Sequence, residues 1–254
     1  MSISDFFGKQ IRLVQNDTGH RAGTDAILLA SLVEASEAGL VVDAGAASGA
    51  VGLCVARRFP SAKVRLIEID QGQIALAQQN IAMNEFSDRV EAIHGDLLGS
   101  YEEREKQGLT KEEADCVITN PPYLDAAAHR VSPDQDKSRA HMMPQEGLTF
   151  WLKSCATMLK PKGRLHMIHR ADQLSEILSA LPKNFGAIRI IPIHPGDDQH
   201  AIRLLLSATK NSRAPLTLVP GFILHEANGQ FTIKTKALHE GQYGFNETWG
   251  KEKK

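Results

Sequence analysis

The most specific chemistry in the sequence lies in one four-residue segment, Asn120-Pro121-Pro122-Tyr123. It follows an apolar run that ends at Thr119, and the two prolines must end that strand because they cannot donate to a sheet ladder. The prolines also stiffen the backbone, so the Asn120 side chain and the Pro121 carbonyl can accept both hydrogens of one planar NH₂ group. Tyr123 adds a flat face on which a base or an amide can stack. This pattern predicts group transfer to a nitrogen by positioning and electrostatics, without a nucleophilic side chain. A strand that simply ends in a proline-rich loop is the alternative.

A glycine-containing loop follows the first predicted strand of the core. The run Leu40–Val42 leads into Asp43-Ala-Gly45-Ala-Ala-Ser-Gly49, and a helix is predicted from about residue 50. Glycines let the backbone approach a ligand, and the helix start favours an anionic or carboxylate group. The loop lacks the Gly-Lys-Ser/Thr ending of a P-loop, and its Gly-x-x-x-Gly spacing differs from the dinucleotide pattern. A tight strand-to-helix turn would require the same glycines, so the loop alone does not identify a ligand.

Two acidic residues end the next two predicted strands. Glu68 closes the run Val64–Ile69, and Asp96 follows the run Val90–Ile93. In an open parallel sheet, ligands bind at the carboxyl ends of the strands, near the point where the strand order reverses. Glu68 can accept hydrogen bonds from ribose hydroxyls and Asp96 from an adenine amino group, and no pyrophosphate site is evident. The set therefore favours S-adenosyl-L-methionine over NAD as the cofactor.

The elements that must position these residues alternate along the chain. Between residues 40 and 170, short apolar runs alternate with helical stretches, which predicts an α/β fold with a mostly parallel sheet and right-handed crossovers. Two apolar runs at 187–193 and 202–207 are joined without a helix, which predicts an antiparallel pair at the sheet edge. Asn228-Gly229, between runs at 222–226 and 231–234, predicts a hairpin.

Composition and charge exclude several classes of protein. The 254 residues are 42% hydrophobic and 23% charged, with a net charge of −1, as in an ordinary globular protein without a global basic field. No run of about 18 apolar residues is present, and the start of the sequence does not resemble a secretory signal. Cys54, Cys116 and Cys155 lie singly in apolar runs, which argues against a zinc site or a disulfide framework. We expect a cytoplasmic protein without a metal site or a membrane segment, and the oligomeric state stays open.

Together, these segments resemble the class I S-adenosyl-methionine-dependent methyltransferases that act on amino groups. The opening segment Gly19-His-Arg-Ala-Gly-Thr-Asp25 further resembles the bacterial tRNA(Val) adenine-N6 methyltransferase family, and the resemblance covers about residues 11–210. It implies a Rossmann-like fold with a seven-stranded, mostly parallel sheet, an antiparallel edge strand and helices on both faces. We expect one domain over residues 1–254, divided into an N-terminal segment with the first helix (1–39), a catalytic core (40–210) and a C-terminal extension (211–254).

The resemblance also implies which residues contact the cofactor. The expected contacts, with Asp43 supporting the loop, are Thr24, Asp43, Gly45, Gly49, Glu68, Asp96, Leu97 and Asn120. Ala47 departs from the family pattern, because a third glycine is common at its position. Thr24 is also expected to cap the helix that follows it.

The substrate implied by the resemblance is an adenine in tRNA, or in another RNA, methylated at N6. Asn120, Pro121 and Tyr123 are the expected catalytic residues, and Tyr123 would also bind the substrate base. Arg130, Lys137 and Arg139, in the segment after the motif, are the candidate RNA contacts. The charges of that segment cancel, so a solvated connector is the alternative. The basic residues of the strip 183–213 are weaker candidates for phosphate contacts.

Two other functions remain open on the sequence alone. A glutamine side-chain N5 methyltransferase acting on a translation protein would use the same acceptors, because an amide also presents an NH₂ group. Members of that kind usually carry an added N-terminal helical domain, and only a short segment precedes the first core helix here. A catalytically silent RNA-binding module of the same fold is disfavoured by the intact Asn-Pro-Pro-Tyr segment.

Overall fold

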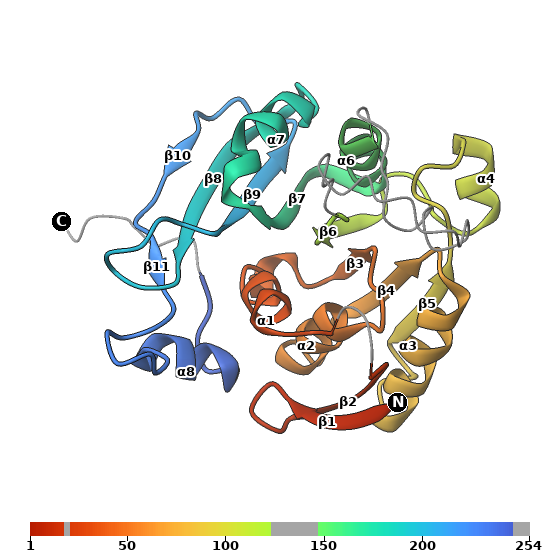
Figure 1. The fold of residues 1–254 in the computed structure, drawn as a ribbon. Helices are drawn as coiled ribbons and strands as arrows, with labels where there is room; N and C mark the ends of the chain where they lie inside the picture. The colour runs from red at the N-terminus through yellow and green to blue at the C-terminus, as the bar shows by residue number, and fades with distance from the viewer. Residues whose placement is uncertain (18–20, 123–146, 246–254) are drawn as a thin grey trace, which may run out of the picture.

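The computed structural model describes residues 1–17, 21–122 and 147–245 (Figure 1). Its strands are β1 (Ser2–Phe6), β2 (Ile11–Gln15), β3 (Leu40–Ala44), β4 (Lys63–Glu68), β5 (Val90–His94), β6 (Ala114–Thr119), β7 (Leu159–Arg170), β8 (Phe185–His194), β9 (Arg203–Lys210), β10 (Thr217–Leu218) and β11 (Phe222–Ile223). Its helices are α1 (Thr24–Ala30), α2 (Ala50–Arg58), α3 (Gln71–Met83), α4 (Tyr101–Lys106), α6 (Gly147–Met158), α7 (Leu174–Ala180) and α8 (Ile233–His239), with 3-10 helices η1 (Ala35–Glu37) and η2 (Ala171–Gln173). No described helix is long and apolar enough to cross a membrane.

A nine-stranded sheet forms the centre of the fold and confirms the predicted α/β class. Its order is β10-β8-β9-β7-β6-β3-β4-β5, with β11 also paired to β8. From β3 the chain adds β4 and β5 on one side, and then β6 and β7 on the other, all of them parallel. The strand order therefore reverses between β3 and β6. The carboxyl ends of these two strands flank the crevice in which such sheets bind ligands.

The predicted antiparallel pair is present at one end of this sheet. β9 runs antiparallel to both β7 and β8, so β9 is the antiparallel strand and β8 lies outside it. The two-residue strands β10 and β11 pair with β8 in parallel and extend the sheet beyond the seven expected strands.

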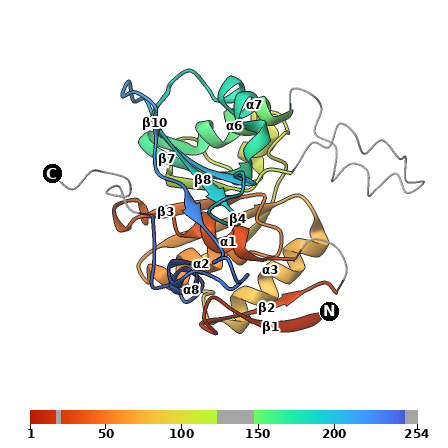
Figure 2. The ribbon, with the colours of Figure 1, turned by 60° about the vertical axis from the view of Figure 1, so that its left-hand side comes forward.

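Helices cover both faces of the sheet, and each face has its own apolar core (Figure 2). Successive strand residues point to opposite faces, so Val41 joins the core beneath α1 and α2, and Val42 joins the core beneath α6 and α7. Because both faces are covered, successive residues of these strands are buried, and the strands therefore read as short apolar runs in the sequence.

The two ends of the chain differ from expectation. An antiparallel hairpin, β1–β2, precedes α1, where no strand was predicted. The predicted strand at 231–234 is wrong, because α8 begins at Ile233 and the Thr232 side chain caps it by accepting from the Thr235 N–H. The predicted hairpin is reduced to two features. These are the turn at Gly229, which has a φ of +78°, and a single bridge between His225 and Phe231.

Two asparagines, one in α3 and one directly after it, attach β2 to the core. The Asn80 amide accepts from the Val14 N–H at 2.7 Å and donates to the Val14 carbonyl at 3.1 Å and to the Ser48 carbonyl at 3.0 Å. Asn84, one turn later, pairs in the same way with the N–H and carbonyl of Arg12 at 2.9 and 2.8 Å. The side chains of a helix thus replace a neighbouring strand, and Asn80 also holds Ser48 of the glycine-containing loop.

These asparagines form a matched pair for a stability test. Asn80 is buried, so Asn80→Ala leaves three buried backbone groups without a partner, and we expect a loss of about 3 kcal/mol in the free energy of unfolding. The partners of Asn84 are solvent-exposed and can bond to water, so Asn84→Ala is expected to cost less than about 1 kcal/mol. Urea unfolding of both variants measures the difference, and equal losses would contradict the role of Asn80.

Candidate active site

The loop after β3 is shaped by its glycines and by one tryptophan. Gly45 has a φ of +76° and Gly49 a φ of +88°, conformations that favour glycine. A Cβ atom on Gly45 would lie 2.9 Å from the Trp151 ring of α6, and one on Gly49 would lie 2.7 Å from Leu66. Ala47 also adopts a positive φ, +46°, at a cost of about 1 kcal/mol. Both glycines are thus required by conformation and packing, whether or not a ligand approaches the loop.

Glu68 gathers backbone N–H groups at the end of β4. Its Oε2 accepts from the Ala47 N–H at 2.9 Å, and its Oε1 accepts from the N–H groups of Ile69 and Asp70 at 2.8 and 3.0 Å. The backbone of the loop is tied to the same strand, because Gly45 and Ala46 both donate to the Ile67 carbonyl at 2.9 Å. The carboxylate predicted to hold a ribose therefore also holds the glycine-containing loop in place.

The turn after β5 is anchored to two helices. Asp96 Oδ1 accepts from the Leu98 N–H at 2.8 Å, and the Asp96 N–H donates to Gln107, just past α4, at 3.0 Å. Leu97 is buried, and its carbonyl accepts from Ser154 of α6 at 2.5 Å. Asp96 is only half-buried, so its position suits a contact with a ligand at this edge.

The described part of the Asn-Pro-Pro-Tyr segment directly follows a residue with a buried hydroxyl. Thr119, the last residue of β6, donates to the Ala44 carbonyl at 2.8 Å and accepts from the Trp151 indole N–H at 2.9 Å. Asn120 follows and is half-buried, and Pro121 is buried. The structure thus brings Asn120 and Pro121 to the same edge as the loop at 43–49. Tyr123, Arg130, Lys137 and Arg139 lie outside the described residues.

Asp43 is buried under the loop and is the most strongly perturbed carboxyl in this edge of the sheet. Burial raises the pKa of Asp43 to about 7, helped by the nearby charge of Glu68 and opposed by a hydrogen bond from the Gly52 N–H at 2.8 Å. That bond joins the end of β3 to the first turn of α2. Asp43 therefore links β3 to α2 beneath the loop and is buried in the protein interior.

The predicted capping role of Thr24 is wrong. Gly23, with an extended backbone, occupies the cap position, and no side chain caps α1. Thr24 is instead the first helical residue, and its Oγ1 lies 3.2 Å from Nε2 of His239, at the end of α8. Asp25 accepts from Arg203 at 2.9 Å. The first turn of α1 is thus held by the C-terminal third of the chain, a connection that local sequence cannot reveal.

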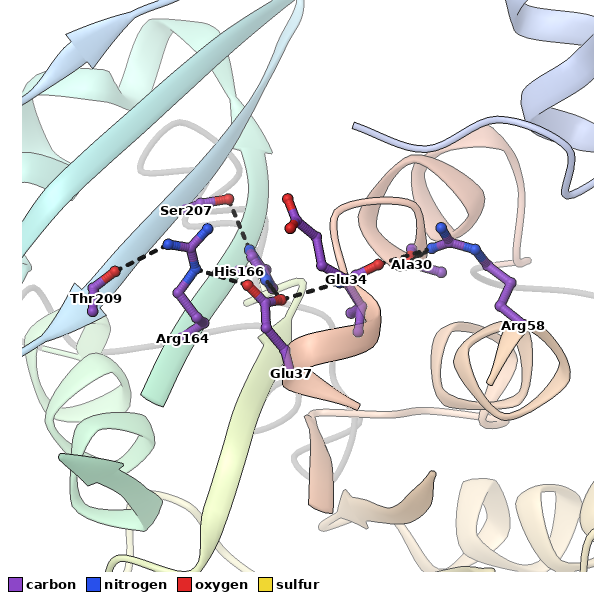
Figure 3. Close-up of polar contacts among 9 residues, drawn as sticks. Ala30, Glu34, Glu37, Arg58, Arg164, His166, Ser207 and Thr209 are labelled. Atoms are coloured by element: carbon purple, nitrogen blue, oxygen red, sulfur yellow. Dashed lines mark hydrogen bonds and ion pairs between the residues drawn. The ribbon is translucent and has the colours of Figure 1, made fainter. Parts of the chain in front are cut away.

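One cluster elsewhere has the side chains of a metal site. Ligand atoms of Glu37, Cys116 and His166 lie within 4.8 Å of one another. However, Glu37 is 2.7 Å from His166 and 2.8 Å from Arg164, and His166 is 2.7 Å from Ser207 (Figure 3). Burial opposes ionisation of Glu37, but His166 and Arg164 together lower its pKa. The guanidinium repels a cation, so we interpret the cluster as a buried ion pair that joins η1 to β7 and β9.

The raised pKa of Asp43 predicts a specific pH dependence of stability. The folded protein keeps the Asp43 proton up to about pH 7, whereas the unfolded chain loses it near pH 4, so stability falls as the pH rises between these values. Asp43→Asn removes this titration and keeps an acceptor for the Gly52 N–H. We expect the stability of Asp43→Asn relative to the unmodified protein to rise by about 2–3 kcal/mol between pH 5 and pH 8. Chemical unfolding at both pH values measures it, and a difference independent of pH would refute the assignment.

Comparison with known proteins agrees with this geometry. The family model described as methyltransferase small domain matches residues 21–196. A Porphyromonas gingivalis protein named tRNA1(Val) (adenine(37)-N6)-methyltransferase is 29% identical over 252 residues, 96% of each chain. A Dyadobacter fermentans protein of the same name is 25% identical over 223 residues, covering 87% of this chain and 89% of its own. The crystal structure of a predicted O-methyltransferase, Atu636 from Agrobacterium tumefaciens, superimposes with a TM-score of 0.74 at 32% identity, covering 87% of this chain and 98% of that one. The predicted fold class and methyl donor are confirmed: the chain belongs to the methyltransferase small domain family and is an S-adenosyl-L-methionine-dependent methyltransferase.

Proposed function

We propose that this methyltransferase modifies the N6 amino group of an adenine in tRNA. The observation that carries the proposal is the position of Asn120 and Pro121 at the carboxyl end of β6, beside the loop at 43–49 and at the reversal of strand order. Two relatives that match this chain over most of its length are named for the same reaction. Asn120 and Pro121 thus lie at the edge of the sheet where we expect the cofactor, and there they can hold the nitrogen that accepts the methyl group.

The residues of this edge fit the donor. Ile69 and Leu98 are apolar yet 53% and 42% exposed, and each lies close in sequence to an acidic acceptor, Glu68 or Asp96. A flat ring with hydrogen-bond donors on its rim, such as adenine, would cover the apolar side chains and satisfy the carboxylates. A carboxylate has about four lone-pair positions. Because Glu68 already accepts three backbone N–H groups, it has capacity for one ribose hydroxyl without displacing a bond.

The chemistry then depends on orientation. The bound donor supplies an electrophilic methyl group on a sulfonium. Asn120 Oδ1 and the Pro121 carbonyl accept the two hydrogens of the target amino group, which leaves the nitrogen lone pair free to form the new C–N bond. The sulfur keeps the electrons of the broken C–S bond, and the nitrogen then loses one proton to solvent. The two acceptors gain strength as positive charge develops on the nitrogen, so they lower the barrier and do more than bind the substrate.

Nitrogen is favoured over oxygen as the methyl acceptor. An alcohol or phenol would need a base to remove its proton, whereas the amide and carbonyl oxygens of Asn120 and Pro121 are only acceptors. Asp43 is buried away from any substrate, and Glu68 is the acceptor expected for the ribose of the donor, so neither is placed to act as that base. The Agrobacterium tumefaciens structure is described as a predicted O-methyltransferase, whereas the acceptors of this chain favour a nitrogen. A glutamine amide remains the alternative substrate, since it presents the same NH₂ group.

We propose the RNA contacts because positively charged side chains can pair with phosphates. Arg130, Lys137 and Arg139 stay predictions, as do Tyr123 as the stacking face and the cytoplasmic location. Within the strip 183–213, two basic residues already have partners inside the protein. Lys210 is buried against the Leu159 carbonyl at 2.7 Å, and Arg203 is paired with Asp25. These two residues are therefore poor candidates for phosphate contacts.

The substrate class is tested directly by product analysis. Purified protein is incubated with total tRNA and labelled S-adenosyl-L-methionine, and the RNA is digested to nucleosides. We expect N6-methyladenosine as the labelled product. In a separate binding measurement, the logarithm of the association constant for RNA should fall linearly with the logarithm of the salt concentration. A parallel incubation supplies a translation protein in place of tRNA, and label on a glutamine of that protein, with none on RNA, would favour the alternative.

The role of Asn120 predicts a loss confined mainly to the chemical step. Asn120→Ala removes one acceptor and keeps the Pro121 carbonyl, so single-turnover methyl transfer should slow by about 10²–10³-fold. Asn120→Asp keeps an oxygen acceptor and should retain more activity. Transfer by Asn120→Ala at the unmodified rate would show that the chemistry happens elsewhere.

A further inference from the structure

Two consecutive side chains of α1 are held by residues far away in the sequence. Asp25 Oδ2 accepts from Arg203 Nε at 2.9 Å, and both side chains are partly buried. Thr24 Oγ1 lies 3.2 Å from His239 Nε2. As the first residue of its helix, Thr24 has no preceding helical turn whose carbonyl its hydroxyl could bond. Its hydroxyl is held from outside the helix instead.

These contacts lie at the edge of the sheet that carries the site. Arg203 begins β9 and pairs with Arg170, the last residue of β7, so it lies at the carboxyl ends of the parallel strands. α1 contacts β6 and β7, which lie on one side of β3 and its glycine-containing loop. The expected adenosine contacts, Glu68 and Asp96, follow β4 and β5 on the other side. Thr24 therefore lies on the opposite side of the glycine-containing loop from the expected adenosine contacts, the side that this placement leaves for the amino-acid end of the cofactor.

The His239 ring is fixed by a stack of three rings. Phe231 lies between His225 and His239, with ring centroids 4.9 and 4.8 Å apart and interplanar angles of 25° and 30°. Nδ1 of His225 is 3.0 Å from the Pro195 carbonyl, directly after β8. Burial lowers the pKa of His239, so the imidazole is neutral at neutral pH and offers one donor and one acceptor. A hydroxyl bonded to this ring keeps further hydrogen-bonding capacity for a second partner.

We propose that His239 is a positioning residue for the cofactor, acting through the Thr24 hydroxyl. The stack fixes the ring, the ring fixes the hydroxyl, and the hydroxyl presents its remaining capacity to the ammonium or carboxylate of the amino-acid end. This proposal rests on the cofactor placement given under the proposed function. It assigns to residues 225–239, which lie outside the central parallel strands and their crossovers, an indirect effect on cofactor affinity.

The test measures binding of S-adenosyl-L-homocysteine to the full chain by calorimetry. His239→Ala and Thr24→Val should each raise its Kd about three- to tenfold, the effect of losing one hydrogen bond. The double variant should bind no more weakly than Thr24→Val alone, because both changes remove the same interaction. His239→Gln can still bond the hydroxyl and should recover part of the affinity. Lys236→Ala, on the exposed side of the same helix, is the matched control and should bind as the unmodified protein does.

Kinetics and stability separate positioning from a structural role. At saturating cofactor, methyl transfer by His239→Ala should proceed at nearly the unmodified kcat, with KM for the cofactor raised. Phe231→Leu loosens the His239 ring but keeps His239 as the partner of Thr24, so its Kd should lie between those of the unmodified protein and His239→Ala. Thermal unfolding is measured for every variant. An unchanged Kd in folded His239→Ala, or additive effects in the double variant, overturns the proposal alone. Failure of the unmodified protein to bind S-adenosyl-L-homocysteine overturns the cofactor placement as well.

Discussion

The Thr119 hydroxyl is the point at which the parts of the site are joined. It donates to the Ala44 carbonyl of β3 and accepts from the Trp151 indole of α6, so one buried atom connects the two central strands and the helix above them. The Trp151 ring also fills the space beside Gly45, where a Cβ atom would be 2.9 Å away. The glycine-containing loop begins at Ala44, one partner of this hydroxyl, and Asn120 follows Thr119 directly. Their relative position, which methyl transfer requires, therefore depends on this junction.

Backbone N–H groups donate hydrogen bonds to two acidic side chains of the site. Glu68 accepts three backbone N–H groups, and Asp43 accepts one while its pKa rises to about 7. Glu68 in this way fixes the loop and is already in place when a ligand arrives. This preorganisation lowers the cost of ordering the site on binding. It also limits what Glu68 can accept from a ribose.

The residues that sequence reasoning identified are those with local signals. Strands such as β4 and β6 are apolar runs ending at an acidic residue or a proline, and parallel strands necessarily bring those ends to one edge. The residues that it missed have distant partners. Trp151 bonds a hydroxyl 32 positions away, and His239 one 215 positions away. The incorrect expectations, the Thr24 cap and the strand at 231–234, were local choices overridden by a neighbouring residue: Gly23 takes the cap position, and Thr232 starts a helix.

The two ends of the chain form one packed unit around α1. The turn of the β1–β2 hairpin reaches α8 (Figure 1), where the Gln10 amide donates to the Glu240 carbonyl at 2.7 Å and Gly241 packs on the Phe7 ring. Asn80 fixes β2 to α3 and to Ser48 of the glycine-containing loop. His239, one residue before Glu240, contacts Thr24. The hairpin is thus joined through Asn80 to Ser48 of the glycine-containing loop, and α8 is joined to the first turn of α1 through Thr24. Under the role proposed for His239, a substitution in α8 would change cofactor affinity without touching the central strands β3 to β7.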